Sequence, residues 1–176
     1  MKQEQDELQK AAKNIAAAAS AWAQSEISTA ILEELALSDL CENFTPNITR
    51  EEFCRLMVRL GEKCSGQDID AYLKAKGLSV NNKFTDTSSA EAAAANALGI
   101  VYGKSETQFA PSNSITRQEA ATMLARTAKL LGLQADTPVQ FADRSTFASW
   151  ATESINFVSG LVDSTSGYQV MGGVGN

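Results

Sequence analysis

The sequence predicts an all-α protein. Alanine, the residue with the highest intrinsic helix propensity, fills 27 of the 176 positions, and only three prolines interrupt the chain. Apolar residues recur at intervals of three and four residues over much of the sequence, which is typical of amphipathic helices. A chain of this length can bury a sizeable core in one domain. We therefore expect residues 1–176 to form a single helical domain.

The first helical region covers residues 5–37. Leu8, Ile15 and Trp22 lie seven residues apart, with alanines between them on the same side. The apolar pattern continues from Ile27, where a second helix is an alternative to one long helix. Small residues along this face would allow close contact with another helix.

Two later helices begin with a capping box, in which an N-cap threonine and a glutamate three residues on bond each other's backbone N–H. The first box is Thr49 with Glu52, and the second is Thr116 with Glu119. Apolar residues follow each box at helical spacing, and two glycines within 61–66 end the first helix. These four capping residues are assigned a structural role.

Three shorter helices complete the prediction. Two are Asp68–Lys76 and Ser89–Leu98, each followed by a glycine that can end a helix. The third contains Trp150 and Leu161, which lie on one apolar face. The expected loops are 79–87, 103–114, 134–142 and a glycine-rich tail at 167–176.

Composition and charge exclude several classes of function. The chain has no histidine, so that catalytic triads, histidine metal ligands and a histidine general base are absent. The net charge of −6 rules out a broad basic surface for nucleic acid or anionic membrane, although a local basic site is compatible with it. No run of 18 apolar residues and no signal peptide occur. We expect no enzyme activity, no metal, no cofactor, no nucleic-acid partner and no membrane insertion.

The cysteines allow two interpretations. Cys41, Cys54 and Cys64 are an odd number without a CxxC motif, which argues against zinc and against a disulfide framework. They are either small buried apolar residues or include one bridge, Cys41–Cys54 or Cys54–Cys64.

An internal repeat organises the chain. The segment Ile48-Thr49-Arg50-x-Glu52 recurs 67 residues later as Ile115-Thr116-Arg117-x-Glu119. Three shorter matches accompany it: Phe44-Thr-Pro46 with Phe109-Ala-Pro111, Phe84-Thr-Asp86 with Phe141-Ala-Asp143, and Trp22-Ala23 with Trp150-Ala151. The predicted layout is motif 1 at about 20–63, an inserted helix at 66–78, motif 2 at about 84–132 and a partial motif 3 at about 141–176. Each helix–loop–helix motif is too small to bury its apolar face alone, so we expect the motifs to pack together.

The ordered set of repeated residues resembles the S-layer homology domain. This resemblance implies three tandem motifs in a pseudo-threefold arrangement around a central helical bundle. It also implies a non-catalytic module that anchors an exported protein to the bacterial cell wall, outside the cell. The partner would be an anionic secondary cell-wall polysaccharide, often carrying pyruvylated amino sugars.

The resemblance also implies ligand-binding residues. The arginines Arg50 and Arg117 would recognise the anion, and the groove would include Trp22, Trp150, Gly103 and Gly99. An arginine at the first position of a helix is unfavourable beside the positive end of the helix dipole. Free N–H groups and a guanidinium together suit a carboxylate. The alternative is an internal pair between each arginine and a carboxylate such as Asp86 or Asp143, and the tryptophans could equally be core residues.

The sequence departs from the family pattern in two places. The first motif lacks its F-x-D start, and no third I-T-R-x-E is present, so we expect the third motif to continue beyond Asn176. These departures leave an alternative function open, which is a protein–protein assembly module that self-associates and has lost glycan binding.

Overall fold

The structure, a computed structural model, describes residues 2–162 and is all-α, as the sequence predicts. No strand occurs among these described residues. The chain divides between Ile48 and Thr49 into two compact units, which are described separately. This division falls inside the predicted first motif, so that the two helices of that motif belong to different units.

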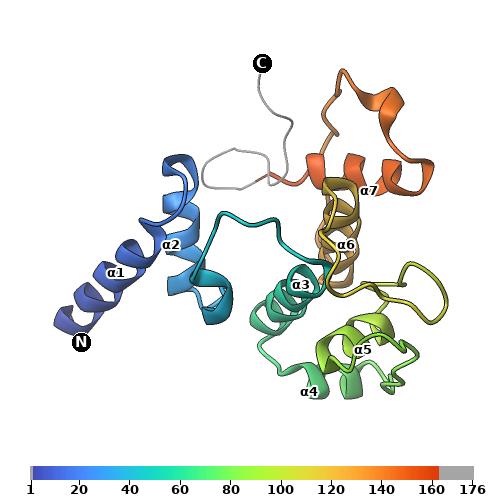
Figure 1. Cartoon of the computed structure of the whole chain (residues 1–176), viewed down its shortest axis with the longest axis horizontal. Helices are drawn as coiled ribbons and strands as arrows, with labels where there is room; N and C mark the ends of the chain where they lie inside the picture. The colour runs from blue at the N-terminus through green and yellow to red at the C-terminus, as the bar shows by residue number, and fades with distance from the viewer. Residues whose placement is uncertain (1, 163–176) are drawn as a thin grey trace. The chain divides into compact units, whose positions relative to one another are not determined.

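The first unit is a helical hairpin. Its elements are α1 (Lys2–Ala16), the 3-10 turn η1 (Ala21–Ala23), α2 (Gln24–Leu32) and the 3-10 turn η2 (Ser38–Cys41). α1 and α2 pack against each other (Figure 1). The single long helix over 5–37 is therefore wrong, and the second helix begins before Ile27. The Gln24 side chain stabilises the break, because its amide donates to the carbonyl of Ala19 (3.0 Å) just beyond α1.

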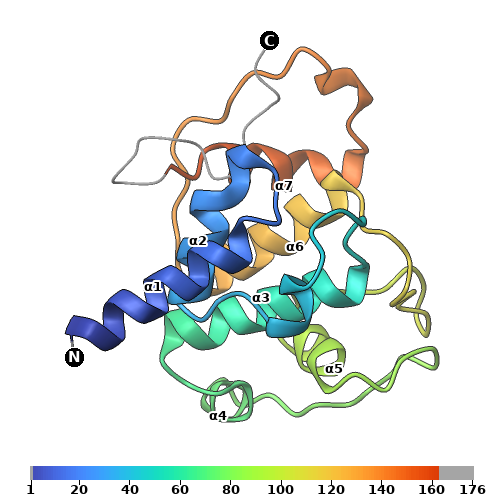
Figure 2. The same cartoon turned by 60° about the vertical axis from the view of Figure 1, so that its left-hand side comes forward.

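The second unit contains the remaining helices. They are α3 (Arg50–Ser65), α4 (Ile69–Ala75), α5 (Ala90–Ala97), α6 (Arg117–Leu130), the 3-10 turn η3 (Arg144–Thr146) and α7 (Ser149–Ser159). α3 packs against α4, α5 and α6, and α6 packs in turn against α7 (Figure 2). The helices predicted from the capping boxes, from Asp68 and Ser89, and around Trp150 are thus confirmed.

Two apolar clusters hold this unit together. The first, between α3, α5, α6 and their loops, centres on the fully buried Phe109, whose ring lies 5.2 Å from that of Phe84. The second lies between α6 and α7, where Ala121, Ala125 and Ala151 are almost fully buried. Because alanine side chains are small, they let α6 and α7 approach each other closely. Part of the high alanine content of the chain lies at this contact.

The helix starts follow the predicted chemistry. Both capping boxes are complete, with Thr49 and Glu52 at α3 and Thr116 and Glu119 at α6. A side-chain cap also starts α5, where Ser89 accepts the N–H of Ala92 at 3.1 Å. These bonds satisfy amides that have no partner inside the helix.

The cysteines are all free thiols. Cys54 is buried, as the apolar interpretation predicts, and burial, aided by the carboxylates of Glu51 and Glu91, raises the pKa of its thiol to about 12. Cys64 is exposed, which contradicts that interpretation for this residue.

Two predictions lie wholly or partly outside the described residues. The glycine-rich tail at 167–176 is not described, and motif 3 is described only as far as residue 162. Within 2–162, no helix is both long and apolar enough to cross a membrane.

Candidate functional site

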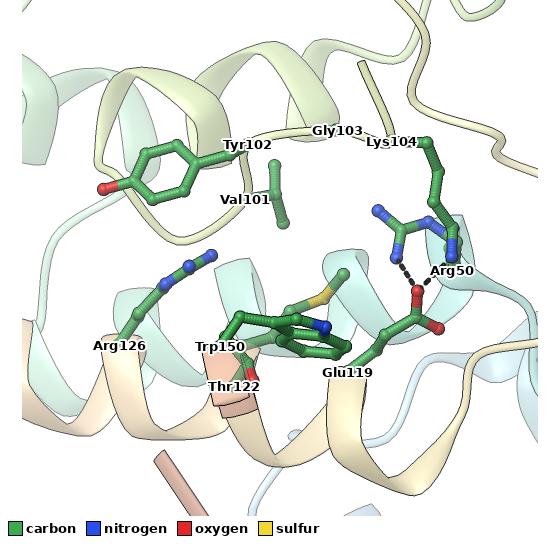
Figure 3. Close-up of a pocket in the computed structure, with 10 residues that line it drawn as sticks. Arg50, Val101, Tyr102, Gly103, Lys104, Glu119, Thr122, Arg126 and Trp150 are labelled. Carbon is green, nitrogen blue, oxygen red and sulfur yellow. Dashed lines mark hydrogen bonds and ion pairs between the residues drawn. The ribbon is translucent and has the colours of Figure 1, made fainter. Parts of the chain in front are cut away.

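A pocket of about 410 Å³ lies in the second unit, between α6 and the loop that follows α5 (Figure 3). Four of its residues come from one face of α6, because they occupy positions i, i+3, i+4 and i+7 of that helix. The lining residues are Arg50, Val101, Tyr102, Gly103, Lys104, Glu119, Thr122, Met123, Arg126 and Trp150.

Arg50 is held at one end of the pocket by two distant residues, Phe109 in the loop before α6 and Glu119 in α6. Its Nε donates to the carbonyl of Phe109 and its Nη1 to Oε1 of Glu119, both at 3.0 Å. The guanidinium carbon also lies 5.2 Å from the centre of the Phe109 ring. Arg50 is only 4% exposed, and its remaining terminal nitrogen points into the pocket (Figure 3).

Glu119 joins two cations at this end of the pocket. Its Oε1 accepts from Arg50 and from Nζ of Lys104, while its Oε2 accepts from the N–H of Thr116 as part of the capping box. Burial favours the neutral acid and is the largest influence on Glu119. The hydrogen bonds from Lys104 and Thr116 and the charges of Arg50 and Lys104 outweigh it, and hold the pKa of Glu119 below its ordinary value.

Arg126 lies at the other end of the pocket (Figure 3). Its guanidinium carbon is 4.3 Å from the centre of the Tyr102 ring, and its Nη1 donates to the carbonyl of Ile100 at 3.3 Å. Burial lowers the pKa of Arg126, and the charge interaction with Tyr102 opposes that change. An arginine nevertheless stays charged, so the pocket contains a second, separate positive centre.

The pocket is therefore positive inside an acidic protein. Its three cations and one carboxylate leave a net charge of +2, whereas the whole chain carries −6. A concave site of one sign concentrates ligands of the opposite charge. The arrangement suits an anion, and the guanidinium groups suit a carboxylate in particular because their fork of donors matches its two oxygens.

The remaining wall of the pocket includes a tight turn at Gly103 and the exposed ring of Trp150. Gly103 has φ of +84°, and a Cβ at this position would lie 2.7 Å from both Cε1 of Phe84 and the carbonyl oxygen of Gln108. Only glycine fits there. Trp150, in the first turn of α7, is 58% exposed, which excludes the interpretation as a core residue.

The structure brings together three of the six ligand-binding residues that the sequence predicts. Arg50, Gly103 and Trp150 line the pocket, and Gly99 lies outside it in the turn after α5. Arg117 is exposed at the start of α6 and is not a lining residue. Trp22 belongs to the first unit, where it is 83% exposed and is not a core residue.

The prediction that free N–H groups at the start of α3 bind the ligand is wrong. The N–H groups of Arg50 and Glu51 donate to the carbonyls of Asn113 (2.9 Å) and Pro111 (3.1 Å), in the loop before α6. Arg50 pairs internally, as the alternative predicted, but its partner is Glu119 rather than Asp86 or Asp143. The carboxylate of Asp86 instead accepts the N–H groups of Phe109 and Ala110, which position the same loop.

Several lining residues were not predicted as part of a site. Lys104 follows Gly103 directly, and Arg126 occupies the repeat position of Arg59, so both had a signal in the sequence. Glu119 was assigned to helix capping alone. Its second role depends on Arg50, 69 residues away, which no local pattern indicates.

Together these features define an all-helical unit with a small cationic pocket. Residues 83–121, which include Gly103, Lys104 and Glu119, match the family model of the S-layer homology domain. Over this segment the match confirms the family that the sequence predicts, and the layout of three tandem motifs stays a prediction. No curated protein and no solved structure matched the chain.

The family match sets the broad function. S-layer homology domains are binding modules rather than catalysts, and in general they attach proteins to the cell wall through secondary cell-wall polymers. This association places the domain at the cell surface.

Proposed function

We propose that this chain anchors an exported protein to the bacterial cell wall by binding an anionic, pyruvylated secondary cell-wall polysaccharide. The pocket around Arg50, Lys104 and Glu119 is the proposed binding site. The observation that carries the proposal is the net charge of +2 on the pocket walls of an acidic chain. The segment that matches the family contributes Lys104 and Glu119 to this pocket, whereas Arg50 and Arg126 lie outside that segment.

The chemistry of the pocket supports a carboxylate of a pyruvyl ketal as the bound group. The Arg50 guanidinium is buried and fixed by Glu119 and Phe109, so it loses little further freedom when it binds. Lys104 can add a second donor, because its side chain is still 49% exposed. Trp150 at the rim offers an exposed ring on which a sugar face can stack.

Sedimentation with cell walls tests the proposal. The full chain is mixed with native walls and with walls from which pyruvate has been removed by mild acid, and the bound fraction is measured. We expect binding to native walls only. Equal binding to both preparations would refute the pyruvyl carboxylate as the recognised group.

A matched pair of variants locates the site. Lys104 and Lys129 are exposed to a similar degree (49% and 44%), and each pairs with a glutamate, but only Lys104 lines the pocket. We expect Lys104→Gln to weaken wall binding several-fold and Lys129→Gln to leave it unchanged. Equal effects would place the site elsewhere. Arg117→Ala and Trp22→Ala in the same assay test the wider set of residues that the family resemblance implies.

Self-association is a second candidate function, which one observation favours. Leu8 and Ile15, seven residues apart on α1, are 60% and 41% exposed, and Trp22 in the following turn η1 is 83% exposed. Exposed apolar residues at this spacing are typical of helix–helix association. Light scattering across a concentration series tests it, and a monomer at every concentration would exclude it.

A further inference from the structure

The pocket has two positive centres with different surroundings. At one end, the charges of Arg50 and Lys104 share the carboxylate of Glu119. At the other end, Arg126 contacts only a ring and a carbonyl, and it has no carboxylate partner among the residues that the structure describes. A half-buried charge that lacks a counter-charge costs free energy, which an anionic ligand group would recover.

The two centres are separated along α6. Glu119 and Arg126 are seven residues apart on the same face of the helix, which corresponds to about 10 Å along its axis. This axial separation, taken between the backbone positions of the two residues, is comparable to the length of two linked sugar rings. Tyr102 and the Ile100 carbonyl fix the orientation of Arg126, and Figure 3 shows its guanidinium beside the space that also contains Trp150.

We propose that Arg126 binds a second carboxylate of the same polymer, so that the recognised unit is an acidic segment about two sugars long with a carboxylate at each end. This inference rests on the proposed function, in which the anions of the polymer are carboxylates. Arg126 then determines specificity, because a segment with one carboxylate leaves one positive centre of the pocket without its counter-charge.

The test uses polysaccharide released from native walls, with its carboxylates methyl-esterified stepwise, and measures by calorimetry how many sites per polymer bind the full chain. If each site needs two carboxylates, binding capacity falls with the square of the fraction left intact. A half-esterified polymer then keeps about a quarter of its capacity, and a requirement for one carboxylate leaves about half.

Two variants separate specificity from structure. We expect Arg126→Gln to bind the untreated polymer about tenfold more weakly. In this variant, binding capacity should fall with the first power of the fraction of intact carboxylates rather than with its square. Lys129→Gln, on the same helix but outside the pocket, should keep the wild-type dependence. A purely structural role of Arg126 would lower the stability measured by circular dichroism without changing this dependence, and that result would overturn the inference.

The wild-type curve decides the question even if a variant fails to fold. A first-power dependence in the wild type would overturn the inference and leave the proposed function intact. No binding to the untreated polymer would refute the proposed function, and the inference with it.

Discussion

Replacing Glu119 with glutamine should destabilise the second unit by about 3 kcal/mol. Removing one partner of a buried ion pair typically costs about 3–5 kcal/mol, because the other charge stays buried. Arg50 would be the charge that stays buried here, since only 5% of its side chain is exposed. Glutamine keeps one acceptor oxygen, and a hydrogen bond to that oxygen would recover about 1 kcal/mol of the lost stability. It cannot serve both Arg50 and the Thr116 N–H, which use different oxygens of Glu119.

The repeat supplies a matched control. Glu52 occupies the same position in the capping box of α3, where its Oε2 accepts the N–H of Thr49 at 2.7 Å, and it makes no ion pair in the described part of the chain. Glu52→Gln should therefore cost about 1 kcal/mol or less, the usual range for a capping interaction. Urea unfolding at pH 7, followed by circular dichroism, measures both variants. Equal losses of unfolding free energy in the two variants would refute the conclusion that the ion pair with Arg50 dominates the contribution of Glu119 to stability.

The difference between Glu119→Gln and the wild type should depend on pH. The pKa of Glu119 is lowered in the folded chain, so its ionised form contributes its full stability above the ordinary value of 4.5. That contribution disappears as the pH falls through the lower folded pKa. The two unfolding free energies should then converge in acid. A difference that stays constant from pH 7 to pH 3 would contradict this account.

Three further predictions concern single side chains. Gly103→Ala should cost more stability than Gly132→Ala, because both glycines have positive φ but only the first has atoms at 2.7 Å from the new Cβ; thermal unfolding compares them. Trp150→Ala should weaken wall sedimentation about tenfold with little loss of stability, since the ring is 58% exposed, and a loss of folding instead would show a core role. Iodoacetamide at pH 8 should label Cys64 quickly and Cys54 only after unfolding, and early labelling of Cys54 would contradict its burial and its pKa of about 12.

Local chemistry made most of the second unit predictable. Capping boxes, helix-ending glycines and apolar spacing depend on residues within one or two turns, and they located α3 to α7 correctly. The break between α1 and α2 was not predicted at its true place. It depends on Gln24, whose side chain bonds a carbonyl five residues earlier, in an alanine-rich stretch that otherwise favours a continuous helix.

The site was less predictable because its contacts join distant parts of the chain. The repeat drew attention to Arg50 and Trp150 as candidate ligand-binding residues, and both line the pocket. Their surroundings depend on the fold: the carbonyl of Phe109 and the carboxylate of Glu119 reach Arg50 across 59 and 69 residues. Sequence spacing cannot choose among the carboxylates that could pair with an arginine over such separations.

The bonds between the start of α3 and the loop before α6 bear on how such domains can be recombined. Asn113 and Pro111 cap α3, Thr49 forms an isolated bridge with Ser114, and Glu119 neutralises Arg50. A chimera joined between α4 and α5, where the predicted motif 1 would give way to motif 2, would keep every helix intact and still separate the buried Arg50 from its carboxylate. A segment exchanged without breaking these contacts would have to run across that predicted boundary, from the start of α3 to the start of α6.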